Sequence, residues 1–137
     1  DMPIIFPIHP RTRKMLSNFG LDDQINAMTN LILTEPLGYL PFLRLMSQSR
    51  LIVTDSGGIQ EETTYLQIPC LTLRENTERP ITVDVGTNQL VGMEPERILA
   101  GYKTAMNSSF EKAVVPPLWD GAASQRILEN ISNFLTK

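Results

Sequence analysis

LIVTDSGGIQEE, residues 51–62, is a short apolar, β-branched run that leads directly into two glycines and then into a helical pattern. β-Branched and apolar residues favour a strand, whereas paired glycines followed by polar and apolar residues at helical spacing favour a helix start. A strand that passes straight into a helix is the first half of a βα unit. This stretch therefore predicts an α/β fold with a parallel sheet.

The rest of the chain repeats the same alternation. Further strands are predicted at residues 3–8, 30–33, 70–73 and 88–91. Helices are predicted at residues 11–19, 39–49, 58–66, 95–106 and 123–135, with Gly20 as the stop after the first. We expect five short buried strands in one Rossmann-like parallel sheet flanked by helices, formed as a single domain over residues 1–137.

Composition limits the class of partner. The 137 residues carry 42% hydrophobic and 20% charged residues and a net charge of −3, which is ordinary for a globular domain and gives no attraction for nucleic acid. No apolar stretch is long enough to span a membrane and no signal peptide opens the chain, so we expect a cytoplasmic setting. Cys70 stands alone in an apolar run, which predicts a core residue rather than a metal ligand. The opening Asp1-Met2-Pro3 suggests a cut inside a longer protein.

The junction after residues 51–54 is the strongest candidate site, because ligands of open parallel sheets bind beyond the carboxyl ends of the strands. Gly57 and Gly58 at a helix start leave backbone N–H groups accessible at the positive end of the helix dipole, which suits a phosphate. Ser56 adds a hydroxyl, and Asp55 is expected to cap the turn. The alternative is a tight turn in which glycine is chosen only for its φ angles.

Two acidic residues follow the glycines. Glu61 and Glu62 are expected in the first turn of the helix, where the dipole alone favours a carboxylate. A carboxylate at this place can also accept hydrogen bonds from the two hydroxyls of a ribose. Both interpretations stay open from the residues alone.

Two other junctions carry candidate ligands for an anion. Arg74 and Arg79 lie in a polar stretch after the strand at 70–73 and could neutralise a diphosphate, unless the charges of that loop pair among themselves. His9 and Arg11 follow the first strand, where a phosphate contact or a proton donor could stand, although a lone histidine is more often structural.

Over nearly the whole chain the motifs resemble the non-hydrolysing UDP-N-acetylglucosamine 2-epimerases. The likeness is carried, in family order and spacing, by PIHPRTR at 7–13, LPF at 40–42, TDSGGIQEE at 54–62, RENTERP at 74–80, GTN at 86–88 and DG at 120–121. The resemblance implies a GT-B architecture, of which this chain is the C-terminal, UDP-binding half and lacks the N-terminal domain.

The resemblance also implies site roles. Ser56, Gly57, Gly58 and Arg79 would bind the diphosphate of UDP-N-acetylglucosamine, and Glu62 would bind the ribose. The uracil would lie against Phe42, although an aromatic residue on a helix shared with Leu40, Leu43 and Met46 is usually a core residue. His9, Arg11 and Arg74 would line the site, with His9 as the one catalytic candidate in the chain.

The reaction implied for the family is elimination of UDP to give a 2-acetamidoglucal, followed by re-addition that inverts C2 and yields UDP-N-acetylmannosamine, without a cofactor or a metal. The proton-moving groups would belong to the missing domain and to residues just before this chain, and the full-length protein would be a homodimer. Ile81 after RENTERP and the bulky loop at 117–120 depart from the usual family pattern. The rival interpretations are the donor-binding half of a GT-B glycosyltransferase and a non-catalytic nucleotide-sugar-binding module.

Overall fold

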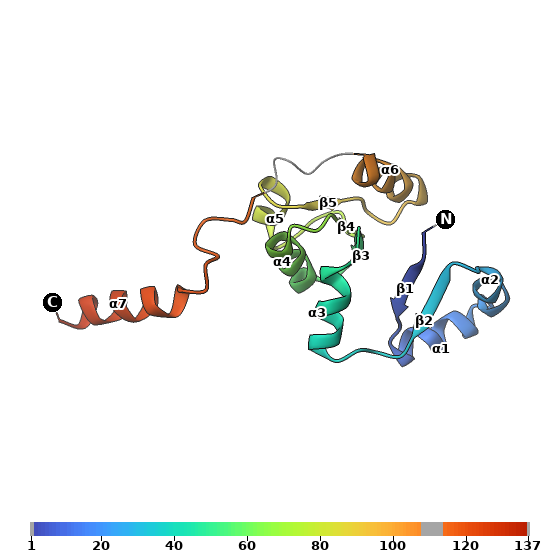
Figure 1. Cartoon of the computed structure of the whole chain (residues 1–137), viewed down its shortest axis with the longest axis horizontal. Coiled ribbons are helices and arrows are strands. Elements are labelled where there is room, and N and C mark those ends of the chain that lie inside the picture. The colour runs from blue at the N-terminus through green and yellow to red at the C-terminus, as the bar shows by residue number, and fades with distance from the viewer. Residues whose placement is uncertain (1, 108–113, 137) are drawn as a thin grey trace. The chain divides into compact units, whose positions relative to one another are not determined.

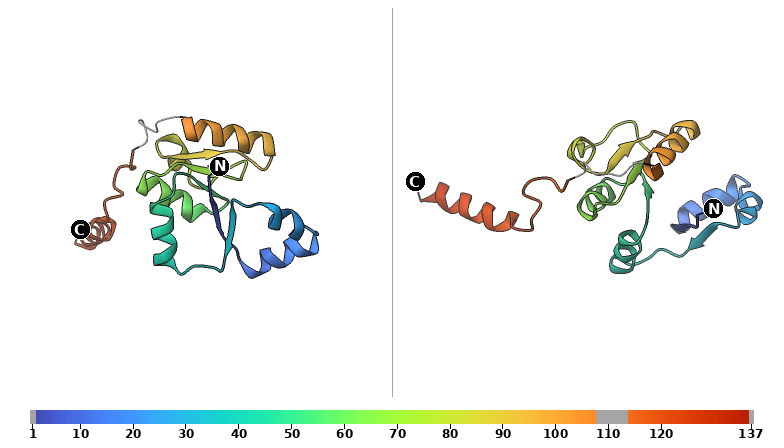
Figure 2. Two further views of the ribbon diagram at one scale, coloured as in Figure 1. Left: turned by 45° about the vertical axis from the view of Figure 1, so that its right-hand side comes forward. Right: turned by 45° about the horizontal axis from the view of Figure 1, so that its top comes forward.

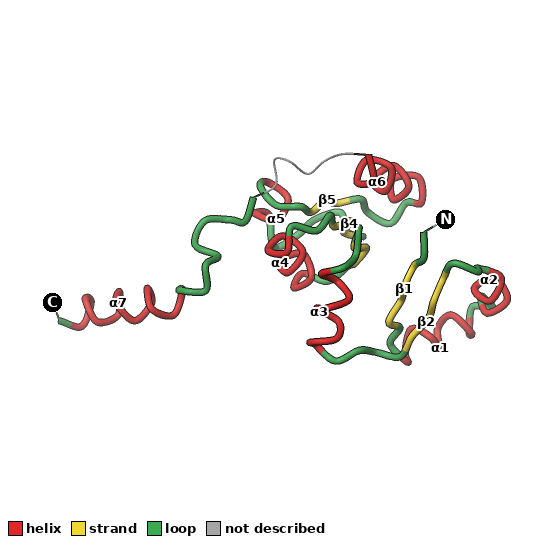
Figure 3. The backbone as a smooth tube through the Cα atoms, viewed as in Figure 1, coloured by secondary structure: helices red, strands yellow, loops and turns green. Residues whose placement is uncertain are grey.

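A computed structural model describes residues 2–107 and 114–136, and strands and helices alternate along these residues as the sequence predicts (Figure 3). The chain divides into two compact units, Asp1–Arg44 and Leu45–Lys137. Every strand pairing within the units is parallel, so the prediction of an α/β fold with parallel strands flanked by helices is confirmed.

The first unit is a βααβ arrangement (Figure 1). Strand β1 (Ile4–Pro7) is followed by helix α1 (Pro10–Asn18), helix α2 (Asp22–Ala27) and strand β2 (Leu31–Thr34). The two strands pair in parallel with Ile4 opposite Leu31 and Pro7 opposite Thr34. Helix α3 (Tyr39–Ser47) follows, and the boundary between the units falls within it.

The strands of this unit are less buried than the sequence predicts. Ile4, Ile5 and Phe6 of β1 are 52%, 43% and 40% exposed, and Ile32 of β2 is 47% exposed. Each strand of a two-stranded sheet has one neighbour, so its side chains meet fewer packing partners than those of a central strand. The expectation that all five strands are buried is therefore wrong for β1 and β2, which pair with each other within the first unit.

The second unit contains the sheet β3 (Ile52–Thr54), β4 (Cys70–Thr72) and β5 (Asn88–Leu90), in that order. Helix α4 (Gly57–Leu66) connects β3 to β4, and the short helix α5 (Pro80–Asp84) precedes β5. Helix α6 (Pro95–Asn107) follows β5, and α7 (Ala123–Leu135) is the last helix that the structure describes in the unit. These connections make β3, β4 and β5 successive strands of βα units.

One face of this sheet is apolar. Leu71 of β4 is buried together with Val91 after β5 and Ala105 of α6, and three partly buried side chains pack around them, namely Leu51, Leu73 and Ile98. Helix α6 covers this face, and α4 lies on the other (Figure 2). The apolar layer under α6 is thus the hydrophobic core of the unit.

The opposite face is polar, because side chains of a strand alternate between the two sides of a sheet. Cys70 and Thr72, the neighbours of Leu71, are both buried, and helix α4 contributes the buried side chains of Gln60, Thr63 and Thr64. The prediction that Cys70 is a core residue is confirmed, and burial raises the pKa of its thiol.

The predicted helices agree with the observed ones to within about two residues at each end, and Gly20 has the positive φ of +66° that suits a helix stop. Helices α2 and α5 were not predicted, because segments of six and five residues are too short to show a helical repeat. Within residues 2–107 and 114–136, no helix combines the length and apolarity needed to cross a membrane.

The start of α7 is fixed by a local ion pair. Asp120 accepts hydrogen bonds from the backbone N–H of Ala122 at 3.0 Å and from both terminal nitrogens of Arg126 at 2.8 and 2.9 Å. These contacts hold the pKa of Asp120 well below its usual range, and the hydrogen bonds from Arg126 contribute most. The DG motif at 120–121 therefore has a structural role at this helix start.

Gly86 provides a test of the polar layer. A Cβ atom at this position would lie 2.5 Å from the carbonyl oxygen of Thr82 and 2.6 Å from Oγ1 of Thr64. Because the carbonyl is backbone and cannot swing away, we expect Gly86→Ala to lower the free energy of unfolding by about 1–3 kcal/mol. Urea denaturation measures this loss, and an unchanged midpoint would contradict the packing described for this turn.

Candidate functional site

The carboxyl ends of the three strands in the second unit lie side by side. Thr54, Thr72 and Leu90 are the last residues of β3, β4 and β5 and are paired in register. The segments that follow β3 and β4 consequently leave the same edge of the sheet. This edge is where an open parallel sheet binds its ligands, and it carries both the glycine pair and the loop with the two arginines.

Helix α4 begins at this edge without a side-chain cap. Ser56 is the N-cap residue, with φ −81° and ψ 130°, and no side chain accepts a hydrogen bond from the first amides of the helix. The expectation that Asp55 caps the turn is wrong: the local side-chain bond runs instead from the backbone N–H of Ser56 to Oγ1 of Thr54, at 3.1 Å. The helix therefore presents uncapped N–H groups at its positive end.

Gly57 and Gly58 are not required by the backbone or by packing. Neither glycine has a positive φ angle, so an L-residue could adopt the same conformation at either position. A Cβ atom added to either would meet no atom within 4 Å. The alternative that glycine is chosen for its φ angles is therefore wrong, and the glycines leave open space in front of the helix end.

The two glutamates lie further along α4 than the sequence predicts. Because the helix starts at Gly57, its first turn contains no acidic residue, and the expectation that Glu61 and Glu62 occupy that turn is wrong. Glu61 Oε1 lies 2.8 Å from Nε of Arg79. The partly exposed Glu62 makes no side-chain hydrogen bond or ion pair to any residue that the structure describes.

Arg79 is thereby placed next to α4. Glu61 is four residues after Gly57, so the two share one face of the helix, and the guanidinium paired with Glu61 lies along that face. Its Nη1 donates to the carbonyl of Glu78 at 3.3 Å. The Arg79 side chain is 41% exposed, so it retains access to solvent.

The other charges of the loop at residues 74–80 do not pair among themselves. Glu75 accepts two hydrogen bonds from Nη1 of Arg97 on α6, at 2.7 and 2.9 Å. Arg74 uses its carbonyl to accept from the backbone N–H of Gly92, and its half-buried side chain has no partner within the described residues. Arg74 and Arg79 therefore remain available as cations of one loop.

A buried hydrogen-bond network behind this edge was not predicted. It connects the side chains of Gln60, Thr72, Thr77, Thr82 and Asn88. The alternation of Leu71 with threonine in β4 is the one sequence signal for a polar layer, and it says nothing about which partners the hydroxyls choose.

In the first unit, His9 is the N-cap of α1. Its Nδ1 accepts a hydrogen bond from the backbone N–H of Arg11 at 3.2 Å, which is the structural role that the sequence left open. The ring is exposed, and its Nε2 makes no hydrogen bond to any residue that the structure describes. Arg11 is exposed on the first turn of α1, and its guanidinium has no partner there.

Phe42 lies on α3 and is half-buried. Of the apolar residues expected to share a core face with it, Met46 is buried and Leu43 is half-buried, but Leu40 is 73% exposed. The expected core face of this helix is therefore only partly formed.

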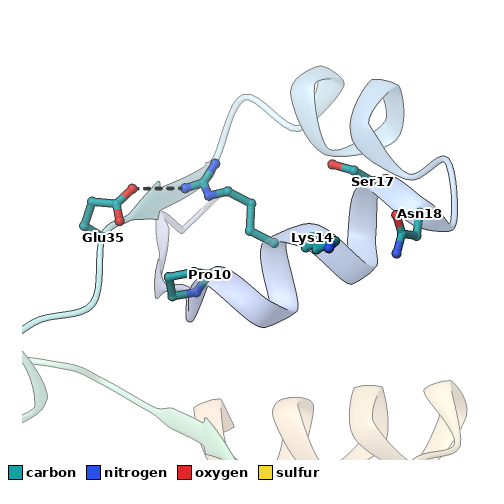
Figure 4. Close-up of a pocket in the computed structure, with 6 residues that line it drawn as sticks. Pro10, Lys14, Ser17, Asn18 and Glu35 are labelled. Atoms are coloured by element: carbon teal, nitrogen blue, oxygen red, sulfur yellow. Dashed lines mark ion pairs between the residues drawn. The ribbon is translucent and has the colours of Figure 1, made fainter.

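An open hollow of about 360 Å³ lies in the first unit (Figure 4). It is lined by Pro10, Arg13, Lys14, Ser17, Asn18 and Glu35. Arg13 and Glu35 approach only to 3.9 Å and are both well exposed, so their ion pair is weak. None of the candidate residues lines this hollow, and no group of three potential metal ligands occurs among the residues that the structure describes.

Comparison with known proteins identifies close relatives. The family model described as UDP-N-acetylglucosamine 2-epimerase matches residues 1–132. The UDP-N-acetylglucosamine 2-epimerase of Methanocaldococcus jannaschii is 44% identical over 128 residues, which cover 93% of this chain and 34% of that protein. The Escherichia coli K12 enzyme of the same name is 38% identical over 139 residues, covering 97% and 36%. The chain thus spans about a third of the length of these curated relatives.

Solved structures give the same result. The M. jannaschii UDP-GlcNAc 2-epimerase in complex with UDP-GlcNAc and UDP superposes with a TM-score of 0.82 at 43% identity, covering 96% of this chain and 36% of that one. The Neisseria meningitidis UDP-GlcNAc 2-epimerase bound to UDP-GlcNAc gives a TM-score of 0.80 at 36% identity, covering 96% and 36%.

The open helix start leads to a stability prediction. We expect Gly58→Ala to leave the free energy of unfolding unchanged or to raise it by up to about 1 kcal/mol, because alanine favours a helix over glycine and the added methyl group meets nothing. Urea denaturation beside Gly86→Ala gives a matched contrast between an open and a crowded glycine. A marked destabilisation by Gly58→Ala would show that packing or backbone geometry needs this glycine.

Proposed function

The chain belongs to the UDP-N-acetylglucosamine 2-epimerase family, and from this membership we propose that it is a C-terminal, UDP-holding part of such an enzyme. The observation that carries the proposal is the pair of glycines at the start of α4, which neither their φ angles nor the surrounding atoms require. A ligand that needs direct access to backbone N–H groups gives these glycines a purpose, and a diphosphate is such a ligand.

The diphosphate of UDP binds at this helix end in our proposal. The amides of Gly57 and Gly58 and the hydroxyl of Ser56 donate to its oxygens, and the uncapped end leaves these donors available. Arg79, on the same side of α4, supplies a positive charge, and Arg74 of the same loop lines the site. The net charge of −3 makes such local groups necessary for binding an anion.

Glu62 accepts hydrogen bonds from the ribose hydroxyls. Its carboxylate has no partner among the described residues, so binding the ribose breaks no existing bond. Glu61, which the sequence could not separate from it, is engaged by Arg79. We further propose that the uracil lies against Phe42, whose half-buried ring keeps a surface for stacking.

The role of this half in the reaction is to hold the leaving group. When UDP is eliminated, the bonding electrons pass to a phosphate oxygen, and donors already aimed at that oxygen stabilise the developing charge without rearranging. The same contacts keep UDP bound until it adds back to the glucal. Inversion at C2 gives UDP-N-acetylmannosamine.

We propose that the proton-moving groups lie in an N-terminal domain, since the chain spans about a third of the length of its curated relatives. His9 is the residue of this chain that could take part, with Arg11 beside it, through the nitrogen that the helix cap leaves unused. We also propose that the whole protein is a cytoplasmic homodimer. Family membership argues against the donor-binding half of a glycosyltransferase.

UDP binding is the first test. Wild-type chain should bind UDP, and Gly58→Ala should lower the affinity at least about tenfold, equal to 1.4 kcal/mol, because its methyl group occupies the approach to the amides. Isothermal titration calorimetry measures this, with phosphate and GDP as comparison ligands. A wild-type chain without preference for UDP would overturn the proposal.

The ribose contact has its own variant. Glu62→Gln should lower UDP affinity about tenfold or more, since hydrogen bonds to a charged group are worth roughly 1.5–3 kcal/mol. Glu96→Gln, which alters an exposed carboxylate in the first turn of α6, is the matched control and should have no effect. Equal affinities for the Glu62 and Glu96 variants would remove Glu62 from the site.

If this chain holds UDP and another domain moves the protons, the 137-residue chain should bind UDP weakly. It should not interconvert UDP-N-acetylglucosamine and UDP-N-acetylmannosamine. Proton NMR of the two sugar nucleotides follows the reaction, with a full-length relative as the positive control. Measurable turnover by this chain would contradict the assignment of the proton chemistry to another domain.

A further inference from the structure

Two threonine hydroxyls hold the backbone of Arg79. The backbone N–H of Arg79 donates to Oγ1 of Thr77 at 2.9 Å, and its carbonyl accepts from Oγ1 of Thr82 at 2.7 Å. Both backbone polar groups of this one residue are therefore bound by side chains. Arg79 is the N-cap of α5, yet its own side chain makes no capping bond.

Both hydroxyls are connected to Gln60, which is completely buried on α4. Thr77 Oγ1 donates to Gln60 Oε1 at 2.6 Å. Asn88 Nδ2 donates to the same oxygen at 3.1 Å and to Thr82 Oγ1 at 3.2 Å, while Thr72 Oγ1 donates to Asn88 Oδ1 at 2.6 Å.

The hydroxyls at the two ends of this network each use their single proton within it. Thr77 donates to Gln60, and Thr82 donates to the carbonyl of Arg79. Gln60 turns its oxygen toward the network, and its buried Nε2 has no hydrogen-bond partner among the described residues. Buried, connected hydrogen bonds fix their members more firmly than isolated surface contacts do.

The side chain of Arg79 is held by the same helix. Its Nε lies 2.8 Å from Oε1 of Glu61, the residue directly after Gln60. Helix α4 is thus connected to the backbone of Arg79 by hydrogen bonds through Gln60 and Thr77, and to its guanidinium by an ion pair with Glu61. Nη2 of Arg79 makes no hydrogen bond or ion pair among the described residues, which leaves it available to a ligand.

We propose that Thr77, acting with Gln60, is a positioning residue that holds Arg79 beside the start of α4 for contact with the diphosphate; this inference rests on the proposed function. Thr77 does not touch the ligand in this account. Its hydroxyl links α4 to the arginine, so its loss allows Arg79 to move relative to the amides of Gly57 and Gly58.

The test removes and restores this hydroxyl. Thr77→Val keeps the side-chain shape without the hydroxyl and should lower UDP affinity about five- to tenfold, whereas Thr77→Ser should stay within about twofold of wild type. Affinity for uridine, which lacks the diphosphate, should not change, although a general loss of structure would lower both. If Thr77→Val does not fold, Gln60→Met removes the other end of the same bond and should give the same selective loss.

A double-mutant cycle tests the route through Arg79. In an Arg79→Ala background, Thr77→Val should change UDP affinity by less than about twofold. Thr63→Val is the control for burial, because its hydroxyl is also buried but donates to carbonyls of its own helix at 2.8 and 3.2 Å. This control should lower the melting temperature and leave UDP affinity unchanged.

Three results would overturn the inference: an unchanged UDP affinity in Thr77→Val, an equal loss for uridine, or a full Thr77→Val effect that persists without Arg79. If Arg79→Ala itself binds UDP normally while Gly58→Ala does not, the positioning role fails and the proposed function stands. If the wild-type chain does not bind UDP, both fail.

Discussion

The polar layer that carries the candidate site depends on one constraint, the buried side-chain amide of Gln60. A fully buried side-chain amide is costly where it is not hydrogen-bonded. The oxygen of Gln60 accepts from Thr77 and Asn88, whereas its Nε2 has no partner among the described residues. These two bonds join α4 to the loop after β4 and to β5. The segments that carry the glycine pair and the arginine are consequently parts of one connected layer.

The two faces of the three-stranded sheet contribute differently to this arrangement. Under α6, Leu71, Val91 and Ala105 form an apolar core, which is stabilised by removal of apolar surface from water and tolerates small shifts. Under α4, the contacts are directional hydrogen bonds, which fix distances and orientations. Stability on one face and precision on the other suit a helix whose first amides have to meet a ligand.

The start of α4 is less stable than a capped helix start, but its backbone amides are accessible to a ligand. Two glycines weaken a helix start, and the chain provides no side-chain cap in compensation. Neither a positive φ angle nor a packing contact explains the two glycines. An anion bound at the amides would satisfy the donors that the chain leaves uncapped, which connects the local sequence to the function of the family.

Sequence predicted much of the fold because its signals are local. Residues 51–62 show a strand, a glycine junction and a helix, and the structure places β3 and α4 there. The exposure of β1 and β2 was not predictable, since burial of a strand depends on contacts between distant residues. Helices α2 and α5 are too short to show periodicity.

Candidate site residues were predicted unequally. The pair Gly57 and Gly58 was found because glycine is informative by itself. The expected Asp55 cap is absent, and the local side-chain hydrogen bond runs from Ser56 N–H to Thr54. The hydrogen bond between Gln60 and Thr77 was not predicted, since nothing in one sequence reveals that two polar side chains 17 positions apart form such a bond.

The central claim is that UDP binds at the amides that begin α4. Nitrogen-15 correlation spectra of the labelled chain, recorded during titration with UDP, report on each of these amides directly. We expect the largest shifts at Ser56, Gly57 and Gly58, with smaller ones at Arg79. Saturable binding of UDP that leaves these amides unshifted and moves resonances of α1 instead would contradict the account.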